Sequence, residues 1–143
     1  MRGTCTRPAR TNVFDLQALE ARFVVTGRYA ARALPANAVV LAGQQSGSLR
    51  YHGGRSTIVW DGIAPDSLDA TIAWLVSKGH PVFIALEDVE EPRFRQRFAT
   101  QRFGRLEWPP QAQINGPVRV RVYDPAGLER YLGGEAIATE HVR

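Results

Sequence analysis

Residues 56–86, STIVWDGIAPDSLDATIAWLVSKGHPVFIAL, decide the expected fold. Residues 56–60 are rich in β-branched side chains, which favours a strand. Asp66 and Gly79 mark the beginning and end of a helix between them. Its apolar face comprises Leu68, Ile72, Leu75 and Val76. Residues 81–86 form a continuous apolar run, typical of a strand buried on both faces. A strand, a helix of about three turns and a second strand predict a right-handed parallel crossover.

The sequence on the amino-terminal side adds a helix and a third strand. Apolar residues recur at three- and four-residue steps over residues 13–34, which predicts an amphipathic helix. Asn12 can cap this helix and Pro35 ends it. Residues 38–42 are a short apolar run that again indicates a buried strand. We therefore expect residues 38–42, 56–60 and 82–86 to be neighbouring parallel strands, with the first helix covering one face of the sheet.

The sequence on the carboxyl-terminal side predicts shorter elements. Asp88 and Glu91 resemble a capping box for a helix that turns Phe94 and Phe98 inward. Residues 106–108 read as an extended segment that stops at two prolines. Valines alternate with polar residues over 118–123, which predicts a strand with one solvated face at the edge of the sheet. Residues 126–132 are expected to form a last short helix.

These elements predict one α/β domain. The expected architecture is a three-layer-like sandwich with a mostly parallel sheet and an antiparallel addition near its C-terminal end. The chain of 143 residues has the size of one domain. We expect residues 1–12 to be a poorly ordered N-terminal tail, residues 13–134 to form the domain, and residues 135–143 to be a loose C-terminal tail.

Composition argues against several functional classes. The 18 basic residues exceed the 14 acidic ones, but they are spread along the chain without the interleaved aromatics of a nucleic-acid platform. The single cysteine allows no internal disulfide, and the three histidines lack the spacing of metal ligands, so no metal or cofactor is expected. As written, the chain has no secretory signal and no apolar run of about 20 residues, so we expect it to be soluble.

The glycine-rich stretch from residue 43 to residue 62, GQQSGSLRYHGGRSTIVWDG, is the first candidate site. It leaves the carboxyl end of an expected parallel strand, where open α/β sheets bind ligands. It contains no Walker loop, no dinucleotide fingerprint and no nucleophile elbow, so no catalytic residue is assigned. Either its glycines only supply turns, or its backbone N–H groups and arginines bind an anion or a hydroxyl-rich sugar. The candidate ligand-binding residues are Gln44, Gln45, Ser46, Gly47, Arg50, His52 and Arg55.

Two further features allow both a structural and a functional interpretation. An acidic cluster follows the third strand: Glu87, Asp88, Glu90 and Glu91. Paired carboxylates can perform acid–base chemistry, but helix capping explains the same residues. Trp108 is interpreted as a wall or turn, with sugar stacking as the alternative.

Five segments in order, FDLQALEARF, LPANAVVLAGQQSGSLRYHGGRSTIVWD, LDATIAWLVSKGHPVFIALEDVEEPRFRQRF, LEWPP and VRVYDP, carry a family resemblance. From about Val13 to Leu132 the chain resembles the soluble C-terminal region of bacterial polytopic membrane glycosyltransferases. These are the GT-C or ArnT-like enzymes, related to the dolichyl-phosphate-mannose–protein mannosyltransferases. The catalytic acid of that family lies in its membrane part, so no residue of this sequence inherits a catalytic role.

The resemblance implies a non-catalytic accessory domain at the extracytoplasmic side of the bacterial inner membrane. Its expected contacts are an acceptor, a lipid-linked sugar head group or a partner protein such as the membrane glycosyltransferase domain. Nucleic acid is not expected as a partner. Two alternatives remain: a small stand-alone α/β enzyme or binding protein acting on a phosphorylated or glycosylated small molecule, and a plain interaction module.

Overall fold

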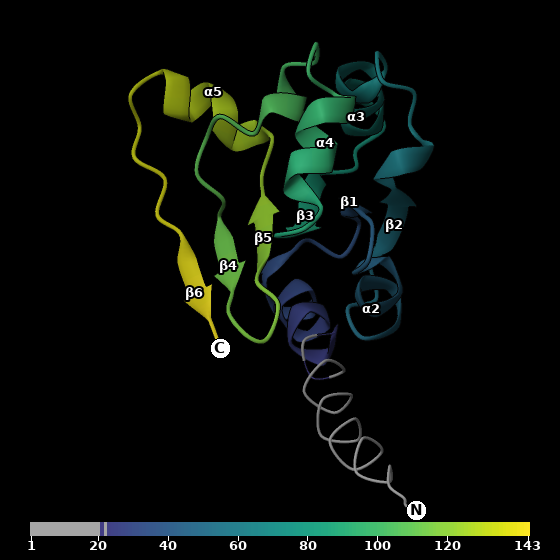
Figure 1. The fold of residues 1–143 in the computed structure, drawn as a ribbon, viewed down its shortest axis with the longest axis vertical. Helices are drawn as coiled ribbons and strands as arrows, with labels where there is room; N and C mark the ends of the chain where they lie inside the picture. The colour runs from purple at the N-terminus through teal and green to yellow at the C-terminus, as the bar shows by residue number, and fades with distance from the viewer. Residues whose placement is uncertain (1–20, 22) are drawn as a thin grey trace, which may run out of the picture.

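The computed structural model describes residue 21 and residues 23–143, and a six-stranded sheet lies at its centre (Figure 1). The strands are β1 (Val39–Ala42), β2 (Ser56–Val59), β3 (Val82–Glu87), β4 (Ala112–Ile114), β5 (Val120–Tyr123) and β6 (Glu140–Val142). Their order across the sheet is β2-β1-β3-β5-β4-β6. The pairs β1–β2, β1–β3 and β4–β6 are parallel, whereas β5 is antiparallel to both β3 and β4. The predicted α/β class, with an antiparallel addition to a mostly parallel sheet, is confirmed.

Helices cover both faces of this sheet. They are an N-terminal helix over residues 23–33, α2 (Ser46–Tyr51), α3 (Leu68–Ser77), α4 (Glu91–Arg97) and α5 (Ala126–Leu132), with 3-10 turns η1 (Trp60–Gly62) and η2 (Phe103–Arg105). In β1, Val40 packs with Leu34 of the N-terminal segment and Leu49 of α2. Its neighbour Leu41 belongs to the opposite core, which α3, α4 and α5 cover. This alternation follows from the period of two in a strand, and it produces three layers.

The predicted β-α-β crossover is confirmed. Strands β2 and β3 lie on either side of β1, and α3 connects them. Leu68, Ile72 and Leu75 of α3 are buried in the core as their helical spacing predicts. Val76 was expected on the same face, but it lies at the margin of that stripe and is 56% exposed.

The chain beyond α4 differs from three predictions. Residues 106–108 are not a strand, because the strand β4 begins only after the two prolines. The alternating strand β5 is internal rather than at the edge, since it pairs with both β3 and β4. The expectation of a loose tail over residues 135–143 is wrong for Glu140–Val142, which pairs in parallel with β4 as β6.

The N-terminal predictions are only partly covered. Residues 23–33 are helical, in agreement with the predicted helix over residues 13–34. Tyr29, Ala30 and Leu34 are buried against the sheet, so this helix covers one face as expected. The expected tail over residues 1–12 and the rest of the predicted helix up to residue 20, with residue 22, lie outside the described residues.

Candidate functional site

The three parallel strands end at one edge of the sheet, and the segments that follow them enclose a crevice. Its cavity of about 250 Å³ is lined by Gly43, Gln44, Val59, Trp60, Asp61, Glu90 and Arg93. A second hollow of about 480 Å³ adjoins it and shares Trp60, Asp61 and Arg93. The helix α2 after β1 packs on one face of the sheet, whereas α4 after β3 packs on the other. This is the topological switch point at which open α/β sheets bind ligands.

Glu90 is a buried residue whose side chain is hydrogen-bonded to the segments around the crevice. Its Oε1 accepts hydrogen bonds from the backbone N–H of Gln44 (3.2 Å) and from Nε1–H of Trp60 (3.0 Å). Its Oε2 accepts a hydrogen bond from the backbone N–H of Glu87 (3.0 Å). One carboxylate therefore links the ends of β1, β2 and β3. Because both of its oxygens are occupied, Glu90 serves the architecture of the crevice.

Gly43 is required for space at this point. A Cβ atom at Gly43 would lie 1.8 Å from Oε1 of Glu90 and 2.8 Å from Nε1 of Trp60. Neither atom can move away without breaking the hydrogen bond between them. The first glycine of the glycine-rich stretch is therefore explained by the close approach of the Glu90 carboxylate.

Substitution of Gly43 by alanine tests this packing. We expect Gly43→Ala to lower the free energy of unfolding by about 1–3 kcal/mol, because the added methyl group displaces the carboxylate. Gly47→Ala is the matched control: no atom lies within 4 Å of its Cβ position, and it lies within α2. The control should stabilise the protein by about 0.5–1 kcal/mol. Urea denaturation followed by circular dichroism measures both values, and equal effects would contradict the proposed close approach.

Trp60 forms an aromatic wall of the crevice. Its ring packs edge to face against Phe94, with 5.5 Å between centroids, and against Phe98 at 6.3 Å. The guanidinium of Arg93 lies over its ring, 5.7 Å from the centroid. Since Trp60 is buried and hydrogen-bonded to Glu90, the wall is fixed before any ligand arrives.

Asp61 and Arg93 bring opposite charges to the same cavity. Both are exposed, and within the described part of the chain neither has a salt-bridge partner. The exposed Gln44 completes the polar lining. The crevice thus offers a carboxylate that accepts hydrogen bonds and a guanidinium and an amide that donate them.

A second polar cluster fastens α4 to β5 beside the crevice. Nη1 of Arg121 lies 2.7 Å from Oε2 of Glu91 and 2.9 Å from Oδ1 of Asp88. The Tyr123 hydroxyl donates to Oε1 of Glu91 at 3.2 Å. Burial, together with the charge of Glu91, raises the pKa of Tyr123, so its phenol remains a donor. Asp88 and Glu91 therefore bind the neighbouring strand, and the predicted capping box is wrong: no side chain caps α4.

The residues predicted as one ligand site are divided by α2. Within the glycine-rich stretch, Ser46–Tyr51 is helical. One group lies at the carboxyl end of β1: Gln44, Gln45, Ser46 and Gly47. The other lies at the far end of α2 or enters β2: Arg50, His52 and Arg55. A helix of this length separates its ends by about 9 Å, so Gln44 does not converge with His52 and Arg55 on one small anion. Gly47 and Arg50, one residue from each group, line a separate hollow of about 420 Å³.

In the first group only Gln44 lines the crevice. Gln45 is fully buried, and its Nε2 donates to Oε2 of Glu87 at 2.8 Å. The Oε1 of Gln45 has no hydrogen-bond partner among the described residues. The backbone N–H of Ser46 donates to the carbonyl of Gly43 at 3.1 Å, which begins the turn into α2. Gln45 and Ser46 thus hold the turn rather than face the cavity.

In the second group Arg55 has a structural role. Its guanidinium donates to the carbonyls of Gly53 (2.8 Å), Ala31 (3.2 Å) and Leu34 (2.8 Å). The last two carbonyls belong to the end of the N-terminal helix, where a cation stabilises unpaired carbonyl groups. Arg55 therefore braces β2 against that helix, while Arg50 and His52 are exposed.

Trp108 also has a structural role. It is buried in the core with Phe103 and Tyr123, and its Nε1–H donates to the carbonyl of Asp124 at 2.8 Å. Trp108 was interpreted as a wall or turn, with sugar stacking as the alternative; because its ring is buried in the core, it has no face open for a sugar to stack on.

Comparisons with known proteins provide no related protein from which a function of the crevice could be inferred. No family model, curated protein or solved structure matches this chain. Among residues 21 and 23–143, no group of three or more His, Cys, Asp or Glu side chains could hold a metal ion. Over the same residues, every helix is too short or too polar to cross a lipid bilayer.

Proposed function

We propose that this chain is a non-catalytic accessory domain that binds a hydroxyl-rich sugar in the crevice and serves a membrane glycosyltransferase. The observation that carries the sugar assignment is the pair of Asp61 and Arg93, opposite charges that line one cavity beside Trp60 and lack salt-bridge partners among the described residues. A sugar hydroxyl can donate to a carboxylate and accept from a guanidinium at the same time.

The same charges favour a neutral sugar over a phosphate. The smaller cavity holds two carboxylates, Asp61 and Glu90, against one guanidinium, Arg93. The adjoining hollow adds the guanidinium of Arg97, which already donates to the carbonyl of Ile63. A phosphate would be repelled by both carboxylates, whereas a sugar hydroxyl uses Asp61 as an acceptor. Arg50 and Arg55, the cations expected to hold an anion, lie at the other end of α2. Of the two ligands that the sequence suggested, an anion and a hydroxyl-rich sugar, the sugar therefore fits the crevice better.

The proposal of a non-catalytic role rests on how the acids are used. Asp61 is the one carboxylate of the crevice cavity without a hydrogen-bond or salt-bridge partner among the described residues, whereas glycoside hydrolysis uses a pair. Glu90 accepts three hydrogen bonds, and Glu91 is held by Arg121 and Tyr123. A general acid or base must be able to exchange its proton with the substrate, and these carboxylates hold the backbone and neighbouring side chains instead.

The link to a membrane glycosyltransferase rests on the ordered sequence resemblance. In that setting the crevice would hold a sugar of the donor head group or of the acceptor close to the membrane enzyme. The genomic DNA upstream tests this part: an in-frame run that encodes several hydrophobic spans is expected. An upstream stop codon close to Met1, with the ribosome-binding site of an independent gene, would favour the stand-alone alternative.

Titration by nuclear magnetic resonance tests the sugar assignment. Methyl mannoside, methyl glucoside, methyl galactoside and inorganic phosphate are added in turn to ¹⁵N-labelled protein. We expect at least one glycoside at millimolar concentration to shift the amides of Gln44, Asp61 and Arg93, and phosphate to leave them unchanged. Asp61→Asn and Arg93→Ala should each weaken glycoside binding at least about tenfold, since a hydrogen bond to a charged group contributes about 1.5–3 kcal/mol.

Two matched substitutions serve as controls. Asp66→Asn and Arg50→Ala change the same charges at exposed positions that do not line the crevice cavity, and glycoside binding should be unchanged in both. Shifts caused by phosphate alone, and abolished by Arg50→Ala, would replace the sugar site with an anion site over α2. Glycoside turnover abolished by Asp61→Asn, a change that should leave stability unaltered, would replace the accessory role with catalysis.

A further inference from the structure

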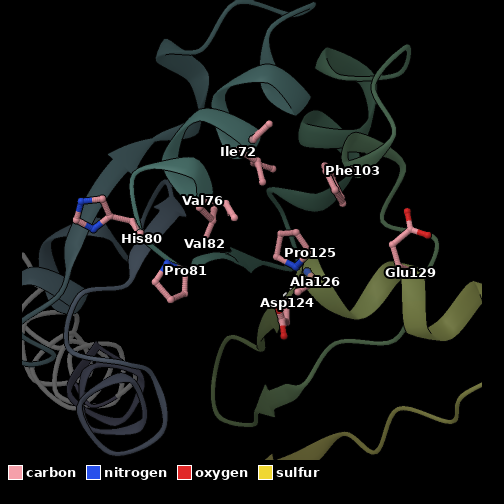
Figure 2. Close-up of a pocket in the computed structure, with 12 residues that line it drawn as sticks. Ile72, Val76, His80, Pro81, Val82, Phe103, Asp124, Pro125, Ala126 and Glu129 are labelled. Carbon is pink, nitrogen blue, oxygen red and sulfur yellow. Dashed lines mark hydrogen bonds between the residues drawn. The ribbon is translucent and has the colours of Figure 1, made fainter.

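A further cavity lies away from the crevice. It has a volume of about 550 Å³ and shares no lining residue with the crevice. Figure 2 shows it between α3, η2, the start of β3 and the beginning of α5. Apolar side chains make up most of its wall: Ile72, Val76, Val82, Phe103, Pro125 and Ala126. The volume falls within the range of about 300–1,000 Å³ that is usual for small-molecule sites.

The polar residues on the rim of this cavity already have partners. Nδ1 of His80 is hydrogen-bonded to the carbonyl of Asn37 at 2.8 Å. Oδ1 of Asp124 accepts from the backbone N–H of Ala126 at 3.0 Å, and Glu129 pairs with Arg102. A polar ligand would therefore compete with existing hydrogen bonds, whereas an apolar ligand needs none of them.

The charges around the cavity also limit the ligand. Asp124 and Glu129 line it, and no lysine or arginine does. Burial raises the pKa of Asp124, which indicates weak solvation at this end of the wall. An anionic head group such as a fatty-acid carboxylate would find no unpaired cation here, because the nearby Arg102 and Arg130 already pair with Glu129 and Asp124.

We propose that this cavity binds an uncharged apolar small molecule, aromatic or alkyl, independently of the sugar site. The ligand displaces water from the valine, isoleucine and phenylalanine walls, and its binding is driven by buried apolar area. Preformed apolar cavities take up small aromatic molecules on this basis alone. The aromatic ring of Phe103 and the proline ring of Pro125, which both face the cavity in Figure 2, suit a flat hydrocarbon.

Toluene and benzoate are the probes that test this proposal, because they share a ring and differ in charge. Methyl ¹H–¹³C spectra of the full chain are recorded during titration with each compound. We expect toluene in the millimolar range to shift the methyl signals of Ile72, Val76 and Val82, and benzoate at equal concentration to leave them in place. Glycoside binding in the crevice should be the same with and without toluene.

Two phenylalanine substitutions on α3 provide the matched pair. Ala73 is exposed and lines the cavity, whereas Ala70 is exposed on the same helix and does not line it. Ala73→Phe should weaken toluene binding at least about tenfold, and Ala70→Phe should leave it unchanged. Melting curves of both variants verify that they fold, and the comparison of toluene with benzoate on the unaltered chain does not depend on them.

Three results would overturn the proposal. The first is the absence of methyl shifts at high toluene concentration, and the second is that benzoate shifts the same methyl signals as strongly as toluene does. The third is that Ala70→Phe weakens toluene binding as much as Ala73→Phe does. If toluene produces no shift and the chain self-associates through a contact that Ala73→Phe abolishes, the cavity is instead part of an interface between two copies.

Discussion

Glu90→Ala is expected to lower the free energy of unfolding by about 3–5 kcal/mol. The substitution leaves the backbone N–H groups of Gln44 and Glu87 and the Nε1–H of Trp60 without their acceptor. A buried donor left unpaired costs about 1–3 kcal/mol. The N–H of Gln44 is only partly buried, and water that enters the space of the shortened side chain offsets a further part of the sum. Urea denaturation followed by far-ultraviolet circular dichroism measures the loss, with an unchanged m-value as the check on two-state behaviour.

Two further variants show whether the carboxylate itself is responsible. Glu107→Ala removes a glutamate whose side chain is 66% exposed, and its effect should stay within about 0.5 kcal/mol. Glu90→Gln keeps one acceptor oxygen but turns an amide N–H₂ toward a neighbouring donor, so its effect should fall between the other two. If Glu90→Ala unfolds at the same urea concentration as Glu107→Ala, the three hydrogen bonds do not hold the crevice together.

Gly43 and Glu90 should also be energetically coupled. The Cβ of Gly43→Ala meets the Glu90 carboxylate, which is absent once Glu90 is alanine. Gly43→Ala should therefore cost less in the Glu90→Ala background than in the original protein. A double-mutant cycle gives this difference directly, and strict additivity would indicate that the two residues do not share one contact.

The β-α-β unit could be predicted because the spacing of its apolar residues along the sequence shows which faces are buried. Strands β1 and β3 are covered by helices on both faces, so they appear as unbroken apolar runs. In α3 the spacing of Leu68, Ile72 and Leu75 marks the face that the sheet covers. Such patterns depend only on the neighbours of a residue in sequence, and they are therefore readable without the fold.

The C-terminal half of the sheet could not be predicted because two of its strands are very short and the sequence pattern of the third suggests the wrong environment. Both β4 and β6 have three residues, too few to show a period. In β5 the arginine at position 121 suggested a solvated edge, but its guanidinium pairs with Glu91 and Asp88 at the start of α4. The alternation in this strand reflects buried and half-buried ion pairs rather than water on one face.

The position of the crevice and Gln44 were predicted, but the other residues that build it were not, because its contacts are distant in sequence. The hydrogen bond from Gln44 to Glu90 spans 46 residues, and that from Trp60 to Glu90 spans 30. Viewed locally, Glu90 is one more acid before a helix, and capping explains it. The available signal was positional: Gly43, Trp60 and Glu90 each follow a parallel strand, and such ends meet at one edge of a sheet.

Phe94→Ala is the second substitution with a large expected effect, a loss of about 3–5 kcal/mol. Phe94 is fully buried, and its ring packs against Phe98 at 4.9 Å and Trp60 at 5.5 Å between centroids. Alanine removes the apolar contacts and leaves a cavity that these rigid rings cannot fill. Phe94→Leu keeps most of the volume and should cost clearly less, while Tyr51→Ala, at an aromatic that is 86% exposed, should stay within about 0.5 kcal/mol.

The variant Phe94→Leu tests whether the aromatic cluster also supports ligand binding in the crevice. Phe94 lines neither hollow, yet it supports Trp60, the wall that both hollows share. If Phe94→Leu remains folded, we expect weaker glycoside binding, because Trp60 and the carboxylate to which it donates lose their fixed position. Asp61→Asn should show the reverse, weaker binding with unchanged stability. If Phe94→Leu binds glycoside as tightly as the original protein, the aromatic cluster is core packing alone, and the polar lining acts without a fixed wall.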